Sequence, residues 1–124
     1  MGNALDIEVR DERGVVIAAV AGEIDISTVA RLRERLYELA DNGGTLIVDL
    51  NRVTFIDSSG LGALVGTARR VAEHGGSLYA VCAQPQPRRL LWTTGLDKRI
   101  PLAATVAGAL MLQEASRGGS GPGA

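Results

Sequence analysis

The sequence predicts a single α/β domain: a mixed sheet of four to five strands, with an antiparallel first strand, flanked by about four helices. Residues 5–10 alternate between apolar and charged side chains, and residues 15–21 are continuously apolar, as expected for an edge strand and a buried strand. Segments with helical periodicity then alternate with short apolar segments, which is typical of parallel sheets. Residues 39–48 also resemble residues 71–81, which begin 32 positions later, so one helix-plus-strand unit occurs twice.

Composition and length exclude several classes of protein. The 124 residues carry a net charge of −1 and include 16 glycines but only one Cys and one His. An internal disulfide is therefore impossible, and neither a Cys/His zinc site nor a dedicated nucleic-acid-binding surface is expected. The longest apolar run, residues 15–21, is far shorter than the ~20 residues that cross a bilayer, and the first residues lack the pattern of a signal peptide. We therefore expect a cytoplasmic protein that uses no metal or cofactor and does not contact a membrane.

The helices and strands can be assigned in order along residues 4–115, the predicted domain. A charged turn at residues 11–14 joins the first two strands into a hairpin. One helix is predicted over residues 27–42, capped by Asp25 or Ser27, and a second over residues 58–74, and each ends at a Gly-Gly pair. Strands are predicted at 45–50, 77–82 and 100–102, and further helices at 84–94 and 105–115. Residues 116–124 are rich in glycine and are predicted to form a flexible tail.

The connection from the third strand to the second helix, residues 51–62, gathers polar side chains at the carboxyl end of the predicted sheet. It places Asp57, Ser58, Ser59 and Gly60 at the helix N-terminus, where unpaired N–H groups favour negative charge. Ligands and partners of open α/β sheets bind at this end. Two interpretations stay open: these residues only cap the helix and form a tight turn, or a serine of the segment carries a phosphate.

Two glycines lie within the second predicted helix. On a helical wheel Ser58, Gly62, Gly66 and Arg69 share one flank beside the apolar stripe. Each glycine inside a helix costs about 1 kcal/mol relative to Ala, so these positions need a reason. Either the flank lets the backbone of a partner protein come close, or the glycines let the helix pack tightly on its own sheet.

No enzymatic site is predicted. A serine hydrolase needs a base beside its nucleophile, yet the only His, His74, lies 16 residues from Ser58, roughly 24 Å along a helix. The only Lys, Lys98, is far in the sequence from the glycines at residues 60–66, which excludes a phosphate-binding P-loop there. The match of residues 60–66 to a dinucleotide fingerprint is weak, because no acidic residue follows at the required distance.

Other polar, aromatic and sulfur-containing side chains are expected to be structural. His74 is expected to be exposed at a helix C-terminus. Cys82 is expected to pack as a small hydrophobic residue, and Trp92 to lie in the core or to cover it. Arg88 and Arg89 are expected to form a solvated helix face.

The residues around Ser58 carry a resemblance to a known family. The segment Phe-Ile-Asp-Ser-Ser-Gly-Leu-Gly at residues 55–62 precedes an amphipathic helix. Supporting motifs are Gly-Glu-Ile-Asp at 22–25, Leu-Ile-Val-Asp-Leu at 46–50, Gly-Gly at 75–76 and Gly-Leu at 95–96. With these motifs, residues 5–113 resemble the STAS family, and within it the bacterial anti-sigma-factor antagonists. The resemblance implies a STAS-type fold, with a mixed sheet, an antiparallel first strand and flanking helices.

The resemblance implies a regulator of transcription that works by partner switching and is not an enzyme. In the family, the serine directly after the motif Asp, here Ser58, is phosphorylated by a serine kinase that is also the anti-sigma factor. The unphosphorylated protein binds this kinase and frees a sigma factor, and a type 2C serine phosphatase removes the phosphate. The protein is then expected to be a monomer when free and not to bind nucleic acid. The expected partner-binding positions, the last of them from the helical wheel, are Asp25, Asp57, Ser59, Gly60, Gly62 and Gly66.

Two other functions remain open from the sequence. A STAS module can serve a sensory complex or a membrane lipid-transport complex, which co-purification with membrane components would favour. A small nucleotide-binding enzyme would bind nucleotide tightly, and the lack of a suitably placed Lys and base argues against it.

Overall fold

A computed structural model of the chain describes residues 5–119. Along these residues five strands alternate with four α-helices and one short 3₁₀ helix, η1. The elements are β1 (Asp6–Glu12), β2 (Val15–Ile24), α1 (Val29–Ala40), β3 (Thr45–Ile56), α2 (Ser58–Glu73), β4 (Ser77–Val81), α3 (Pro85–Thr93), η1 (Leu96–Lys98), β5 (Leu102–Ala103) and α4 (Val106–Gly119).

The strands form one sheet whose spatial order follows the chain, β1-β2-β3-β4-β5. β1 pairs with β2 antiparallel, and every later pair is parallel. This confirms the predicted mixed sheet, its antiparallel first strand and the four helices. β1 forms an exposed edge of the sheet, and its alternating charged side chains disfavour pairing of that edge with another chain.

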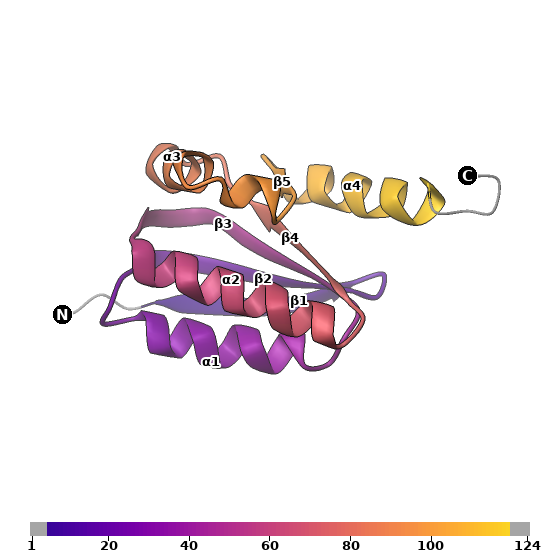
Figure 1. Cartoon of the computed structure of the whole chain (residues 1–124), viewed down its shortest axis with the longest axis horizontal. Coiled ribbons are helices and arrows are strands. Elements are labelled where there is room, and N and C mark those ends of the chain that lie inside the picture. Colours follow the sequence, from indigo (N-terminus) through magenta and orange to yellow (C-terminus); the bar gives the residue numbers. More distant parts are fainter. Residues whose placement is uncertain (1–4, 120–124) are drawn as a thin grey trace.

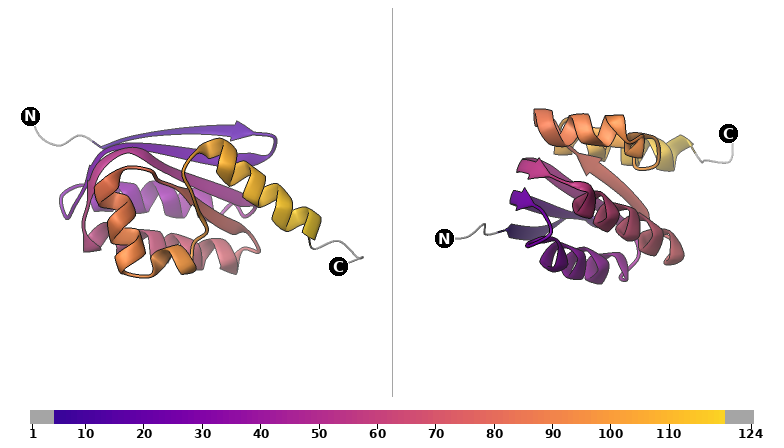
Figure 2. Two further views of the ribbon diagram at one scale, coloured as in Figure 1. Left: turned by 90° about the horizontal axis from the view of Figure 1, so that it is seen from above. Right: turned by 60° about the vertical axis from the view of Figure 1, so that its left-hand side comes forward.

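The helices cover the two faces of the sheet unequally (Figures 1 and 2). α1 and α2 lie side by side on one face and bury the larger core, which contains Leu36, Val48 and Leu64. α4 covers part of the other face and buries a smaller cluster around Ile17, Ile47 and Tyr79. α3 and η1 follow β4; α3 lies beside the carboxyl half of β3, and η1 packs against α3.

β3 is longer than the sequence analysis predicts. The strand continues past Leu50 to Ile56, because its second half stays paired with β2 as far as Ile24↔Ile56. Register shifts along this pairing absorb extra residues of β3, and the bulges break the regular alternation that a sequence pattern relies on. The segment before Ser58 is therefore a strand and not a loop, so the start of α2 is held by the sheet itself.

The C-terminal helix also differs from its predicted bounds. α4 continues to Gly119, beyond the expected end at residue 115. The rest of the segment that was predicted to be a tail, residues 120–124, lies outside the described residues, so the tail stays a prediction.

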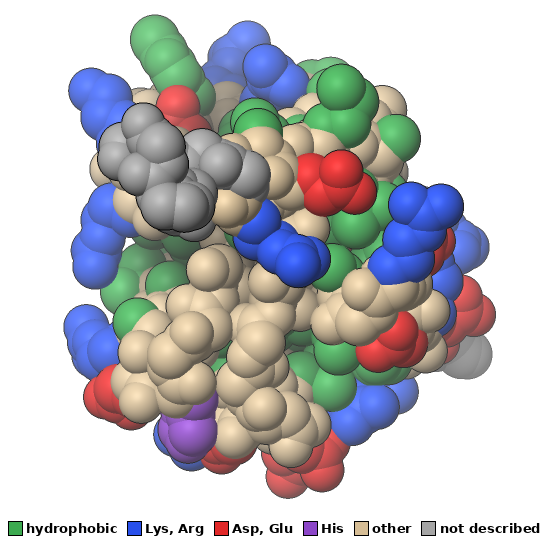
Figure 3. Space-filling model, turned by 90° about the vertical axis from the view of Figure 1, so that its right-hand side faces the viewer, with side chains coloured by type: hydrophobic (Ala, Val, Ile, Leu, Met, Phe, Trp, Pro, Cys, Tyr) green, Lys and Arg blue, Asp and Glu red, His purple; other side chains and the backbone are tan. Residues whose placement is uncertain are grey.

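The two Gly-Gly turns, which the sequence repeats, lie against each other at the end of the molecule seen in Figure 3. Ser77 N–H donates to the Gly44 carbonyl at 3.0 Å, so the turn after α2 rests on the turn after α1. A Cβ atom on Gly76 would lie 2.1 Å from the Gly44 carbonyl oxygen. Only a glycine fits at position 76, because no side chain fits between the two backbones.

Candidate functional site

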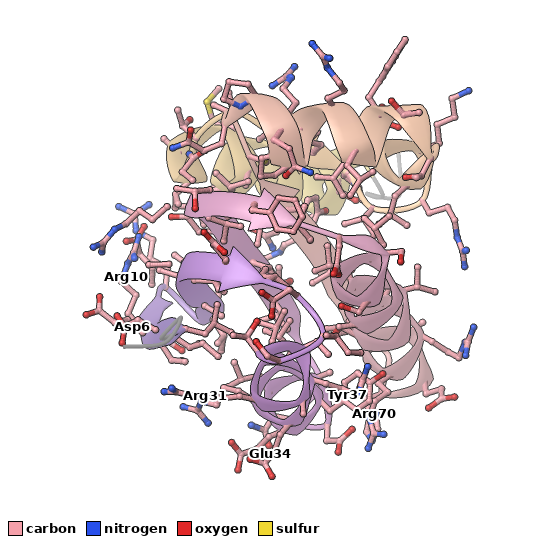
Figure 4. The ribbon with its side chains drawn as sticks, turned by 90° about the vertical axis from the view of Figure 1, so that its left-hand side faces the viewer. Asp6, Arg10, Arg31, Glu34, Tyr37 and Arg70 are labelled. Carbon is pink, nitrogen blue, oxygen red and sulfur yellow. The ribbon has the colours of Figure 1, made fainter. Side chains whose placement is uncertain are left out.

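Ser58 lies where β2 and β3 end and α2 begins. Asp57 N–H donates to the Ile24 carbonyl at 3.2 Å, which joins the end of β2 to the first residues of α2. Asp25 directly follows Ile24, so this hydrogen bond brings the loops that carry Asp25 and Asp57 together. Figure 4 views the molecule from this end, where α1 and α2 both begin.

Asp57 is the N-cap of α2. Its carboxylate accepts from the backbone N–H groups of Ser59, at 2.9 Å, and Gly60, at 3.4 Å. The Ser59 hydroxyl donates to the same carboxylate oxygen. The capping interpretation therefore holds for Asp57, and Ser59 is held by Asp57 in a half-buried position.

Ser58, by contrast, is exposed at the first position of α2. Within residues 5–119 its hydroxyl has no hydrogen-bond partner. The oxygen therefore faces solvent at a helix N-terminus, where free N–H groups and the helix dipole stabilise added negative charge. Chemically, this is a nucleophile that another enzyme can reach and modify.

Asp25 organises the loop between β2 and α1. Its carboxylate accepts from Ser27 N–H at 2.9 Å, from the Ser27 hydroxyl at 2.6 Å and from Thr28 N–H at 3.2 Å. The hydrogen bond from the Ser27 hydroxyl lowers the pKa of Asp25 below its ordinary value. The helix itself begins at Val29 with Thr28 as its N-cap residue, so neither Asp25 nor Ser27 is the N-cap residue. Asp25 thus places a carboxylate that is charged at neutral pH beside the start of α2.

The three glycines of α2 have different surroundings. A Cβ atom on Gly60 would lie 2.5 Å from Ile56 Cγ1 and 2.7 Å from Ile24 Cγ2, so the helix start presses on the strand ends. Gly66 faces Tyr37 of α1 and lies two turns beyond Ser58, about 12 Å along the helix. Gly62 is exposed and has nothing within 4 Å of its Cβ position. Packing within the protein therefore accounts for Gly60 and Gly66 but not for Gly62.

Two large apolar side chains in the segments that end at Asp25 and Ser58 are exposed, and neither was expected from the sequence to be a site residue. Ile26, in the loop with Asp25, is 80% exposed, and Phe55, near the end of β3, is 40% exposed. The segments that carry them are neighbours, because Glu23 pairs with Phe55 and Ile24 with Ile56 at the ends of the two strands. Ile26 could have been found from the sequence, because it is a lone apolar residue between Asp25 and Ser27. The orientation of Phe55 could not, because the bulges of β3 break the alternation of side chains along the strand.

α3 holds the outer edge of β3, which β4 leaves unpaired beyond Asp49. Gln86 mimics a neighbouring strand: its side-chain oxygen accepts from Ile56 N–H at 3.0 Å, and its amide donates to the Ile56 carbonyl at 2.9 Å. Gln84 donates to the Asn51 carbonyl at 2.7 Å, and the Asn51 side chain accepts from Ala83 N–H at 2.6 Å. These contacts satisfy backbone groups of a strand edge and fix the strand that leads into Ser58.

Most of the residues that were expected to be structural have the predicted surroundings, and one does not. Cys82 is buried, and burial raises the pKa of its thiol, so it packs as a small hydrophobic residue. His74 is exposed at the C-cap of α2, and Arg88 and Arg89 are exposed on α3. The prediction for Trp92 was wrong: its side chain is 71% exposed. α3 turns Leu91 and Pro87 inward instead, so the core contacts of this short helix do not include the Trp face.

Among residues 5–119, no group of three or more His, Cys, Asp or Glu side chains is arranged to hold a metal ion. None of the described helices is long and apolar enough to cross a membrane.

Comparison with known proteins extends these observations. The sequence matches the family described as "STAS domain" over residues 6–109. It is 36% identical over 104 residues to the anti-sigma-B factor antagonist of Bacillus subtilis, covering 84% of this chain and 95% of the relative. The crystal structure of an anti-sigma factor antagonist from Mycobacterium paratuberculosis has a TM-score of 0.82 and 33% identity, over 88% of this chain and 93% of that one. The phosphorylated form of the Bacillus cell fate determinant SpoIIAA has a TM-score of 0.64 and 26% identity, over 86% and 96%.

Proposed function

This chain belongs to the STAS domain family, and from that membership and the geometry around Ser58 we propose that it is an anti-sigma-factor antagonist switched by phosphorylation of Ser58. Its similarity to proteins named as anti-sigma factor antagonists supports the first part. The observation that carries the second part is the exposed Ser58 hydroxyl without a hydrogen-bond partner in the described chain, at the N-terminus of α2. The similarity to a protein solved in a phosphorylated form also supports it.

The geometry favours Ser58 over Ser59 as the acceptor. The Ser59 hydroxyl is half-buried and donates to the Asp57 carboxylate, so an attack by Ser59 would first break this hydrogen bond. Ser58 is the adjacent residue, but its oxygen is open to solvent. A kinase can therefore bring ATP to Ser58 without unfolding the helix start.

The docking surface for the anti-sigma factor is defined here as Ile26, Phe55, Ser58 and Gly62, with Asp25 and Asp57 at its border. Exposed apolar side chains in the segments next to a reactive hydroxyl are the kind of feature that a partner protein covers. The open space at Gly62 lets the partner backbone approach α2 closely. Gly60 contributes indirectly, because it lets α2 begin directly on the ends of β2 and β3.

Phosphorylation would switch this surface through charge. The step transfers the γ-phosphoryl group of ATP to Ser58 Oγ, releases ADP and passes the hydroxyl proton to a base of the kinase. The phosphate adds about −1.5 to −2 charges beside Asp25 and Asp57. The helix N-terminus stabilises that charge in the free protein, whereas a partner that covers the surface must desolvate it. The fold stays the same while the affinity for the anti-sigma factor falls.

The partners of this cycle follow from the family. The unphosphorylated protein binds a serine kinase that is itself the anti-sigma factor, which frees the sigma factor in the cytoplasm. A type 2C serine phosphatase hydrolyses the Ser58 phosphate and restores binding. The chain supplies the acceptor hydroxyl and the docking surface, and the partners supply the catalytic groups.

The test uses the purified protein, ATP and a serine-kinase anti-sigma factor produced from the same organism. We expect one phosphate on Ser58 in the wild type, none in Ser58→Ala, and a phosphate on Ser58 in the matched control Ser59→Ala. Ser58→Ala should bind the kinase persistently, and Ser58→Asp should bind it more weakly. Phosphate at another residue, or equal affinities of the Ala and Asp variants, would contradict the proposal.

A further inference from the structure

The outer face of α3 exposes the only Trp of the chain. Trp92 is 71% exposed, although Trp is the largest apolar side chain and the chain contains a single one. Arg88 and Arg89 are exposed one turn earlier on the same helix. Together with Pro85 and Thr93, these three side chains line a shallow hollow of about 550 Å³. Trp and Arg are enriched among the few residues that carry most of the binding energy at protein interfaces.

The outer face of α3 carries positive charge, although the chain as a whole does not. Pro85–Thr93 contains two Arg and no Asp or Glu, while the whole chain has a net charge of −1. Within residues 5–119, neither Arg88 nor Arg89 takes part in an ion pair. Arg88 donates only to the Cys82 carbonyl, at 3.3 Å. The positive charge of the face is therefore available to a carboxylate from outside.

α3 is held at the same end of the molecule as Ser58. Gln86, at the start of α3, makes both hydrogen bonds to the backbone of Ile56, two residues before Ser58. Figures 1 and 4 show α3 across the strand ends where α1 and α2 begin. A partner that covers Ser58 therefore lies close to α3, which is hydrogen-bonded to the strand that leads into Ser58.

We propose that the outer face of α3, formed by Arg88, Arg89 and Trp92, is a second contact for the anti-sigma factor and takes an acidic surface segment of that partner. The inference rests on the function proposed above. Trp92 inserts between apolar side chains of the partner's segment, and the carboxylates of that segment pair with Arg88 and Arg89. The two contacts have opposite charge: phosphorylation makes the Ser58 surface more acidic, while the α3 face stays basic. The α3 contact thus keeps some affinity for the partner after phosphorylation. The phosphorylated protein still binds the partner more weakly than the unphosphorylated protein does.

A protein segment suits this face better than a nucleic acid. Nucleic-acid-binding surfaces commonly make about 6–10 phosphate contacts, whereas α3 offers two arginines. The short, mixed apolar and basic face matches an acidic peptide with apolar side chains, because it offers both an anchor and charge complementarity.

The first test measures binding to the anti-sigma factor kinase. Trp92→Ala should raise the Kd about tenfold or more, and the double variant Arg88→Glu/Arg89→Glu should raise it further and reduce its dependence on salt. Arg88→Lys/Arg89→Lys keeps the charge and should retain most of the affinity. Met111→Ala is the matched control, because Met111 is 72% exposed on α4 and should leave the Kd unchanged. Trp92→Ala and Met111→Ala should unfold at the wild-type temperature, since these side chains are exposed.

The second test uses the single Trp as a reporter. In protein labelled with 5-fluorotryptophan, the one ¹⁹F signal should shift when the kinase is added to the unphosphorylated protein. In Ser58→Asp, with its weaker affinity, the same shift should appear at higher kinase concentration. An unmoved signal at saturation, or a wild-type Kd for Trp92→Ala, would overturn the inference while leaving phosphorylation at Ser58 intact.

Three other results would also overturn it, and two of them would assign the face to another occupant. If the wild type is neither bound nor phosphorylated by the kinase, the proposed function fails and this inference fails with it. A dimer in light scattering that Trp92→Ala dissociates would assign the face to a second copy of the chain. DNA or RNA binding that Arg88→Glu/Arg89→Glu abolishes would assign it to a nucleic acid.

Discussion

The Tyr37 hydroxyl of α1 occupies the space that a side chain at Gly66 of α2 would need: a Cβ atom there would lie 1.9 Å from Tyr37 Oη. Arg70 lies with its guanidinium 4.6 Å from the centre of the Tyr37 ring and donates to Asp41 at 3.0 and 2.9 Å. Figure 4 shows Tyr37 and Arg70 together between the two helices. A helical glycine that looked like part of a docking flank in the sequence is thus required by the α1–α2 contact.

Gly66→Ala should destabilise the fold through this contact. The added methyl displaces Tyr37 from beneath Arg70, and such overpacking costs about 1–3 kcal/mol, which outweighs the gain of roughly 1 kcal/mol from Ala in a helix. Urea unfolding measures the change. In a Tyr37→Phe background, which removes the closest atom, the same substitution should cost less. Equal losses in the two backgrounds would show that the contact with Tyr37 is not the cause.

Gly62→Ala should separate stability from binding. Nothing lies within 4 Å of the Cβ position of Gly62, so Ala should raise the free energy of unfolding by about 0.5–1 kcal/mol through its helix propensity. If the open space at Gly62 admits the partner backbone, the same variant should bind the anti-sigma factor more weakly although its fold is more stable. Thermal unfolding and a binding titration on one preparation check both effects. A stabilised variant with wild-type affinity would remove Gly62 from the docking surface.

Gln86→Ala should loosen the strand that leads into Ser58. It removes both hydrogen bonds to Ile56 and leaves backbone groups at the strand edge without partners, which costs about 1–3 kcal/mol. Hydrogen exchange at the Ile56 amide should accelerate accordingly. Gln86→Glu is the matched control: it keeps the acceptor for Ile56 N–H and should preserve most of the protection. Unchanged exchange in Gln86→Ala would show that the pairing does not hold the strand.

Asp41 should contribute a small stabilisation that disappears in acid. The hydrogen bonds from Arg70 lower the pKa of Asp41 below its ordinary value of 3.8. The charged form is thus favoured in the folded state, so the stabilisation is present above pH 3.8 and is lost as the pH falls through the lower folded pKa. Because the pair is exposed, the effect is modest.

The variant Asp41→Asn isolates this effect from other acidic groups. Its melting temperature should lie below that of the wild type at neutral pH, and the gap should close as the pH falls below about 4. A gap that widens in acid would contradict the proposed sign.

The match between sequence pattern and structure depends on the kind of element. α1 and α2 were predicted to within two residues, because buried positions such as Leu32, Leu36 and Leu64 repeat at helical spacing. β3 was predicted six residues too short, because its second half is bulged and pairs with β2 although its pattern is irregular. Local patterns thus located elements whose packing is regular, and missed a pairing whose register shifts.

The same division applies to the candidate site. The sequence by itself determined that an Asp-Ser-Ser-Gly segment caps a helix at the carboxyl end of a sheet, because caps and Gly-Gly turns depend on short-range chemistry. Only the tertiary structure decided which hydroxyl is free, which glycine is open to a partner and that Trp92 faces solvent. Those outcomes depend on Asp57 binding Ser59, on Tyr37 lying against Gly66 and on α3 turning Leu91 inward. The hydrogen bond between Asp57 and Ser59 is local, but its geometry depends on how β3 leads into α2. The other two join elements far apart in the chain, and no pattern along one element contains that information.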